Sequence, residues 1–353
     1  MHDEVNPPCG FDATTPVSAG WPDARSPINL LSLRLFGDRI EPKGLAQKDW
    51  KNVDHHNQTT AGHEYRPALS RFGRTTDGRN PLPCHGDFTP VRRVDEVMTP
   101  SAFADLSGCR AVVTGASSGI GRAIALELAR GGADVLVHCG SSLSQAQIVR
   151  DECRTLGRES EVLSQDVSEA SSLAEFVERA WQCWGGIEIW INNAGADLLT
   201  GSGARLEYSE RLQRLFEVDI RSTIHLARDV GRRMRETGRG VILNIGWDQA
   251  ERGMAGDSGE LFAAAKSAVM GFTRSLAMSL APKVRVNCIA PGWIRTAWGE
   301  QASETWQQRV LDETPLARWG TPEDVACLAR FLASDQAAYI TGQVININGG
   351  AVR

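Results

Sequence analysis

Short apolar runs alternate with longer amphipathic segments from about residue 107 to the end of the chain. The apolar runs predict strands, and the amphipathic segments predict helices because their apolar positions recur at helical spacing. Strands are expected at 110–114, 135–139, 160–164, 187–192, 241–245, 284–289 and 343–347, and helices near 120–130, 144–156, 168–184, 208–236, 261–280 and 322–333. This alternation predicts an α/β domain with one doubly wound, parallel, seven-stranded sheet and helices on both faces.

Residues 1–97 lack this alternation and contain most of the proline in the chain. We expect them to form an irregular or disordered N-terminal extension, followed by the folded domain at 98–353. Met98 lies about a dozen residues before the first strand, where such a domain naturally starts. We therefore expect that the extension is a dispensable tail, or that the start of the chain has been assigned too far upstream. Its histidines and one cysteine match no familiar metal-ligand spacing, so no metal site is expected; they are His55, His56, His63, Cys84 and His85.

Composition excludes several classes of function. The chain has 353 residues, of which 42% are hydrophobic and 23% charged, as in ordinary globular proteins. A net charge of −5 without a basic stripe argues against nucleic acid as a partner. No apolar run approaches the roughly 18–20 residues of a membrane span, and the first residues do not resemble a secretory signal. Eight scattered cysteines fit reduced thiols in a cytoplasmic protein.

A glycine-rich turn joins the first predicted strand to the first predicted helix. It reads Thr114-Gly115-Ala116-Ser117-Ser118-Gly119-Ile120-Gly121. Glycines at such a turn allow the backbone to approach a pyrophosphate, and the free N–H groups of the following helix favour its negative charge. The second strand of a βαβ unit follows at 135–139, which makes a dinucleotide-phosphate cradle the favoured interpretation.

Six motifs then occur in an order and spacing that resemble the short-chain dehydrogenase/reductase family over residues 105–353. They are the glycine turn at 114–121, Asp166-Val167 after the third strand, Asn192-Asn193-Ala194-Gly195 after the fourth, and the segments 285–292, 321–326 and 339–343. The ketoacyl-carrier-protein reductase and sugar dehydrogenase branch is the most similar. The resemblance implies a Rossmann-type sheet, a nicotinamide dinucleotide, an unknown small-molecule substrate and a homodimer or homotetramer.

The resemblance also assigns cofactor-binding positions. They are Gly115, Ser117, Ser118, Gly119, Ile120, Gly121, Ser141, Ser142, Asp166, Val167, Asn193, Ala194, Gly195, Lys266, Pro291, Gly292, Ile294 and Thr296. The end of the second strand carries no carboxylate to bind the ribose hydroxyls of NAD and repel a 2′-phosphate. Ser141 and Ser142 can donate to such a phosphate, and Arg122 adds charge if it points toward it. NADP is therefore preferred over NAD.

The catalytic positions of the family do not match. The family uses a tyrosine as proton donor, a lysine four residues later, a serine that polarises the carbonyl and an asparagine in the preceding long helix. Here Lys266 is in place, but the tyrosine position is Phe262, the serine position is Trp247 and the asparagine position is Asp219. None of the tyrosines precedes a lysine by four residues; they are Tyr65, Tyr208 and Tyr339.

Three functions follow from this mismatch. The first is a dinucleotide-binding family member that is weak or inactive as a carbonyl reductase. The second is an active NADP-dependent oxidoreductase with a rearranged site, which uses a carboxylate from Asp219, Asp248, Asp257 or Glu260, or a reactive substrate that needs no strong acid. The third is a non-catalytic binding or regulatory partner subunit. Four tryptophans in the segment that covers substrate in the family line an aromatic pocket or pack a lid and an oligomer interface; they are Trp293, Trp298, Trp306 and Trp319.

Overall fold

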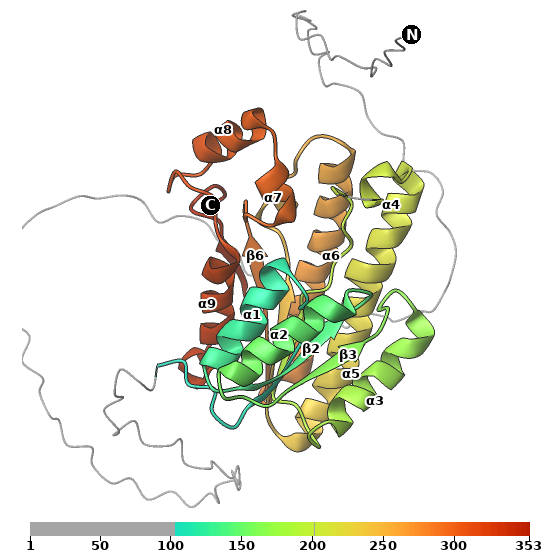
Figure 1. Ribbon diagram of the computed structural model, residues 1–353, viewed down its shortest axis with the longest axis vertical. Helices are drawn as coiled ribbons and strands as arrows, with labels where there is room; N and C mark the ends of the chain where they lie inside the picture. The colour runs from blue at the N-terminus through green and yellow to red at the C-terminus, as the bar shows by residue number, and fades with distance from the viewer. Residues whose placement is uncertain (1–102, 201) are drawn as a thin grey trace, which may run out of the picture. The chain divides into compact units, whose positions relative to one another are not determined.

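The computed structural model describes residues 103–200 and 202–353. In this part of the chain, seven parallel strands form one sheet in the order β3-β2-β1-β4-β5-β6-β7 (Figure 1). The strands are β1 (Arg110–Val113), β2 (Asp134–Cys139), β3 (Ser160–Ser164), β4 (Ile189–Asn192), β5 (Gly240–Ile245), β6 (Val284–Pro291) and β7 (Val344–Ile347). The predicted fold class is confirmed. The expectations for residues 1–97, Met98 and Tyr65 fall outside the described residues.

Helices follow the strands as the alternation predicts. They are α1 (Gly119–Arg130), α2 (Leu143–Thr155), α3 (Leu173–Gln182), α4 (Tyr208–Leu215), α5 (Ser222–Thr237), α6 (Asp257–Leu280), α7 (Ala297–Gln301), α8 (Glu304–Glu313) and α9 (Pro322–Ala333). The helix expected at 208–236 is interrupted by a π-helical segment, Phe216–Arg221. Helices α7 and α8 were not predicted, because α7 is only five residues long and α8 has one buried residue, Val310.

Alternate residues of each strand pack against opposite faces of the sheet. Val113 and Val137 pack in one core with residues of α1, α2 and α9, whereas Val112 and Trp190 pack in the other with residues of α3, α5 and α6. Both faces of the central strands are covered, so their residues form near-continuous apolar runs. This two-sided burial fixes the strand register.

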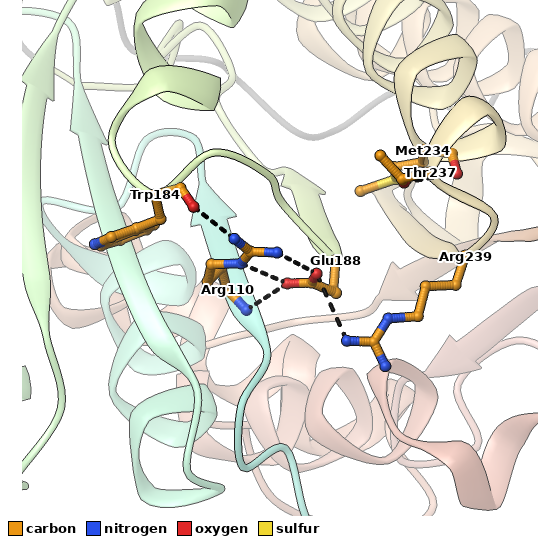
Figure 2. A network of polar contacts seen from close by, with 6 residues as sticks. All are labelled: Arg110, Trp184, Glu188, Met234, Thr237 and Arg239. Carbon is orange, nitrogen blue, oxygen red and sulfur yellow. Dashed lines mark hydrogen bonds and ion pairs between the residues drawn. The ribbon is translucent and has the colours of Figure 1, made fainter.

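A polar network ties together the amino ends of the strands, opposite to the edge that carries the motifs. Arg110, at the start of β1, donates from Nε and Nη2 to Glu188 at 3.0 and 2.6 Å, and from Nη1 to the carbonyl of Trp184 at 2.6 Å. Arg239, just before β5, lies 3.6 Å from the same carboxylate (Figure 2). Burial alone would raise the pKa of Glu188, but the hydrogen bonds from Arg110 hold it below its ordinary value. The network aligns β1, β4 and β5 at one edge.

Candidate functional site

The sequence motifs meet at the carboxyl edge of the sheet. Strand order reverses between β1 and β4, because β2 and β3 lie on one side of β1 and the later strands lie on the other. At such a reversal the connections leave toward opposite faces and open a crevice beyond the strand ends. The glycine turn follows β1 and the 193–195 segment follows β4, so the two motifs flank this crevice.

The glycine turn is too tightly packed to accept side chains at two positions. Gly115 has φ of +63°, in the region that favours glycine. A Cβ atom on Gly121 would lie 2.2 Å from the carbonyl oxygen of Gly115 and 2.4 Å from Nδ2 of Asn193. The Asn193 amide donates to the carbonyls of Thr114 (2.9 Å) and Gly115 (3.0 Å). Asn193 therefore supports the turn from the end of β4, a role that the sequence did not reveal.

Helix α1 presents its amino end to the turn. Ser118, its N-cap residue, makes no side-chain capping hydrogen bond, and the first turn contains no acidic residue. The backbone N–H groups of that turn and the helix dipole are therefore free of a competing carboxylate, as at an anion-binding site. A Cβ atom on Gly119 would lie 3.6 Å from Cγ2 of Thr296, so the start of α1 faces the segment that follows β6.

His138, near the end of β2, connects two predicted cofactor segments. The backbone N–H of Gly115 donates to its Nδ1 at 3.1 Å, so Nε2 carries the proton and donates to the carbonyl of Gln165 at 2.9 Å. The ring is 1% exposed. Burial lowers the pKa of His138 to about 4, and the neutral ring joins the glycine turn to the segment that leads to Asp166.

We expect this histidine to make stability fall with acid. The unfolded chain takes up a proton near the ordinary histidine pKa of about 6.5, whereas the folded chain resists it down to about 4. The stability is therefore present above about pH 6.5 and is lost as the pH falls toward 4. Between roughly pH 7 and 4.5, the advantage of wild type over His138→Asn in unfolding free energy should shrink by about 2–3 kcal/mol. Urea denaturation of both proteins measures it; parallel pH profiles would contradict the assignment.

A buried chain of polar side chains positions α6 against the strand ends. Trp190 donates from Nε1 to Oδ1 of Asn192 at 2.8 Å, and Asn192 donates from Nδ2 to Oδ1 of Asn244 at 2.8 Å. Asn244 in turn donates to Oγ1 of Thr273 in α6 at 2.9 Å. All four side chains are buried, so their hydrogen bonds are costly to break and fix the position of α6.

Lys266 of α6 forms a buried ion pair with Asp219. Its Nζ lies 2.9 Å from Oδ2 of Asp219 and donates to the carbonyl of Ile245 at 3.2 Å. The Asp219 side chain is 1% exposed, and its Oδ1 accepts from the backbone N–H of Ala196 at 2.8 Å. Asp219 lies inside the π-helical segment. The structure thus joins the expected lysine and asparagine positions through a direct ion pair.

The expected tyrosine and serine positions carry two rings in contact. Trp247 follows β5, Phe262 lies in the first turns of α6, and their ring centroids are 6.4 Å apart in an edge-to-face arrangement. Tyr208, the tyrosine nearest in sequence, is exposed and donates to Oε2 of Glu260 at 3.4 Å. Neither side chain at 247 or 262 can give a proton to a substrate. Phe262 has no polar hydrogen, and the indole N–H of Trp247 only donates a hydrogen bond.

A cleft of about 590 Å³ opens between these rings and the glycine turn. It is bordered by residues from several of the predicted cofactor and catalytic positions, which are Ile120, Trp247, Phe262, Lys266, Pro291, Gly292, Ile294 and Thr296. Its size lies within the range of about 300–1,000 Å³ usual for small-molecule sites. The structure therefore brings the two halves of the predicted site into one cleft.

The carboxylates proposed as substitute acids lie in different places. Asp257 lies at the exposed rim of the cleft, whereas Glu260 is exposed beside Tyr208. Asp248 lines a separate cavity of about 290 Å³. Asn348 donates to its Oδ2 at 3.1 Å, and burial raises the pKa of Asp248 to about 6. Asp248 therefore lines a different cavity from the cleft that contains Lys266.

The remaining predicted cofactor residues surround the ends of β2 and β3. Ser141 and Ser142 are exposed after β2, and Asp166 is exposed after β3, with Val167 buried beside it. Arg122 differs from expectation: its Nη2 donates to both carboxylate oxygens of Glu152 at 2.8 Å. Its charge is offset by this ion pair, which leaves the two serines as the candidate donors for a 2′-phosphate.

The comparisons with known proteins agree with this geometry. Residues 115–352 match the family model described as enoyl-(acyl carrier protein) reductase. The chain is 36% identical to cyclohexanol dehydrogenase from Rhodococcus sp. (strain TK6), over 69% of this chain and 96% of that protein. It is 38% identical to 3-oxoacyl-(acyl-carrier-protein) reductase from Pseudomonas aeruginosa, over 69% and 98%.

The chain belongs to the short-chain dehydrogenase/reductase family. Among solved structures, 7α-hydroxysteroid dehydrogenase in complex with NADH and 7-oxo glycochenodeoxycholic acid superposes with a TM-score of 0.66 at 32% identity, over 72% of this chain and 98% of that one.

In the described residues of this family member, no helix is long and apolar enough to cross a membrane. Nor do those residues bring together a group of histidine, cysteine and acidic side chains able to hold a metal ion.

The cleft fits the nicotinamide dinucleotide that this family binds. Three features fit such a molecule. The cradle has no room for a side chain at Gly121, the amino end of α1 is uncapped, and Lys266 lies at the cleft wall. When bound, the dinucleotide supplies the hydride for carbonyl reduction. The chain's own groups then determine how the dinucleotide and a substrate are held.

Proposed function

We propose that this protein binds a nicotinamide dinucleotide and is weak or inactive as a carbonyl reductase. The proposal rests on one observation: the cleft wall where the family resemblance expects a phenol and a hydroxyl carries the rings of Phe262 and Trp247. A positioned acid contributes about 10²–10⁴-fold to the rate, and loss of a carbonyl donor costs about 10²–10³-fold. Ordinary ketone reduction is therefore slow even with the cofactor in place.

Turnover measurements test this proposal. Oxidation of NADPH and NADH is followed by absorbance with a panel of aliphatic, cyclic and aromatic ketones, after cofactor binding has been established by calorimetry. We expect binding of the cofactor with turnover well below the roughly 1–10³ s⁻¹ typical of enzymes. Turnover within that range would overturn the proposal, and absence of cofactor binding would leave only the function of a non-catalytic partner.

A second function remains favoured by one observation. Asp257 borders the same cleft as Lys266, so an active oxidoreductase with a rearranged site has a carboxyl group available at the rim. If the panel reveals an active substrate, Asp257→Asn should abolish its turnover. The oligomeric state and the cytoplasmic location stay predictions.

Cofactor preference is tested by a substitution at the end of β2. Gly140 is exposed, and a Cβ atom there would meet no atom within 4 Å. We expect wild type to bind NADP more tightly than NAD. Gly140→Asp should weaken NADP binding about tenfold, because a carboxylate repels the 2′-phosphate by about 1.4 kcal/mol or more.

Gly140→Asn is the matched control, because it has the same shape without the charge. Calorimetric titration of both cofactors should find its affinities close to wild type. Tighter binding of NAD than NADP by wild type would refute the preference.

A further inference from the structure

Five aromatic side chains border the cleft. Two groups of rings from separate parts of the chain border it. We call Trp247 and Phe262 the aromatic pair, and Trp293, Trp298 and Trp306 the tryptophan triad. The pair comes from the end of β5 and from α6, whereas the triad comes from the segment after β6 and from α7 and α8. Figure 1 shows α7 and α8 together at one end of the domain.

The rings of the triad support one another. The centroids of Trp293 and Trp298 are 6.0 Å apart with an interplanar angle of 29°, and Trp306 lies 5.4 and 5.6 Å from these two. Behind them Trp319 is 3% exposed and packs 6.1 Å from Trp298. These separations are those of favourable ring–ring contacts, so the triad is a preformed surface whose members remain half-exposed toward the cleft.

One ring face of the tryptophan triad is not free for a cationic ligand. An aromatic cage attracts quaternary ammonium groups when its ring faces are free. Here the guanidinium of Arg309 lies 4.6 Å from the ring centroid of Trp306, and its Nε donates to Glu313 at 2.7 Å. Trp293 donates from Nε1 to the same carboxylate at 3.3 Å. The chain's own cation therefore already occupies one ring face of the tryptophan triad.

We propose that the substrate half of this cleft selects an uncharged, planar, fused-ring aromatic molecule bearing a hydroxyl or carbonyl group. This inference rests on the proposed function, because it names the ligand class of the same cleft. Flat rings gain contact with the aromatic pair and the triad that puckered rings of equal carbon number cannot gain. Two cationic side chains border the same cleft, Lys266 and Arg309, and either can donate to the oxygen of the ligand.

A matched pair of probes tests planarity. Calorimetry with the full-length protein compares 2-naphthol with decahydro-2-naphthol, which has the same ring skeleton and hydroxyl but is saturated and puckered. We expect 2-naphthol to bind about tenfold more tightly, the equivalent of one or two aromatic contacts. Equal affinities would overturn the proposal, as would tighter binding of phenyltrimethylammonium than of 2-naphthol.

Variants assign the preference to the triad. In Trp306→Leu the ratio of the two affinities should fall to about twofold or less, whereas Trp306→Phe should keep most of it because a ring remains. Trp181→Leu is the matched control, since Trp181 lies on α3 outside the cleft and also carries an arginine over its ring, Arg233 at 5.7 Å. A ratio unchanged in Trp306→Leu, or lost equally in Trp181→Leu, would contradict the assignment.

Titration of NADP and NAD into the same samples separates this inference from the proposed function. Selective naphthol binding without cofactor binding would overturn the dinucleotide proposal and support the aromatic ligand class. Cofactor binding without naphthol selectivity would support the dinucleotide proposal and overturn the aromatic ligand class.

Discussion

Phe262→Tyr, Trp247→Ser and Asp219→Asn combined in one chain should raise the reduction of a simple ketone by about 10²–10⁴-fold over wild type. The phenol at 262 would lie one helical turn from Lys266, on the same face of α6. The serine would restore a donor for the carbonyl oxygen and remove a large ring from the cleft. Steady-state oxidation of NADPH with a cyclic ketone measures the gain.

The third substitution has its own test. In the double variant that keeps Asp219, this carboxylate still lies 2.9 Å from Lys266 and offsets the charge that would lower the pKa of the new phenol. In reduction the phenol is the proton donor, and a phenol whose pKa stays near 10 is the weaker acid. The double variant should therefore reduce the ketone more slowly than the triple variant near neutral pH, but should keep its activity to higher pH. Identical pH profiles for the two variants would show that Asp219 does not act on this position. Phe262→Tyr alone should stay close to wild type, because Trp247 is still present.

Lys266→Met should lower the free energy of unfolding by about 3–5 kcal/mol. The substitution leaves the Asp219 carboxylate, which is 1% exposed, with the N–H of Ala196 as its remaining hydrogen bond in the described structure. A buried charge without its counter-charge is strongly destabilising. Urea denaturation near neutral pH measures the loss.

Two control variants test whether the loss comes from the buried charge of Asp219. Lys266→Met combined with Asp219→Asn should recover most of the stability, because no buried charge then remains. Arg274→Met removes a cation from the same helix, α6, where Arg274 pairs with Glu251 at 2.7 Å but both side chains are largely exposed. It should cost about 0.5 kcal/mol or less. Equal losses in Lys266→Met and Arg274→Met would mean that the buried pair contributes no more than a surface pair.

Most of the fold is predictable because every strand except β3 is buried on both faces or ends at a glycine or proline turn. The apolar run at 110–113 and the amphipathic segment at 119–130 differ from the prediction by one residue at one end. Helices α7 and α8 carry no such signal, because α7 has only five residues and Val310 is the one buried residue of α8.

The site was predictable where residues act through the backbone. The glycines of the turn are recognisable in the sequence, and at Gly115 and Gly121 the structure leaves no room for a side chain. Long-range partners are different: nothing near Arg122 in sequence reveals that Glu152 binds it, and His138 looks like any strand residue until Gly115 and Gln165 are placed around it. The direct contact between Lys266 and Asp219 depends on the local winding of another helix, which residue patterns did not reveal.

That winding has a consequence for how the protein can evolve. A π-helical segment is equivalent to one residue inserted into an α-helix, so loss of a single codon between 216 and 221 would let α4 and α5 merge into one regular helix. Every side chain on one side of the deletion would rotate by about 100°, and the residue now at 219 would leave the interior. Insertions and deletions in this segment should therefore be far more damaging than in the flanking turns of the same helix.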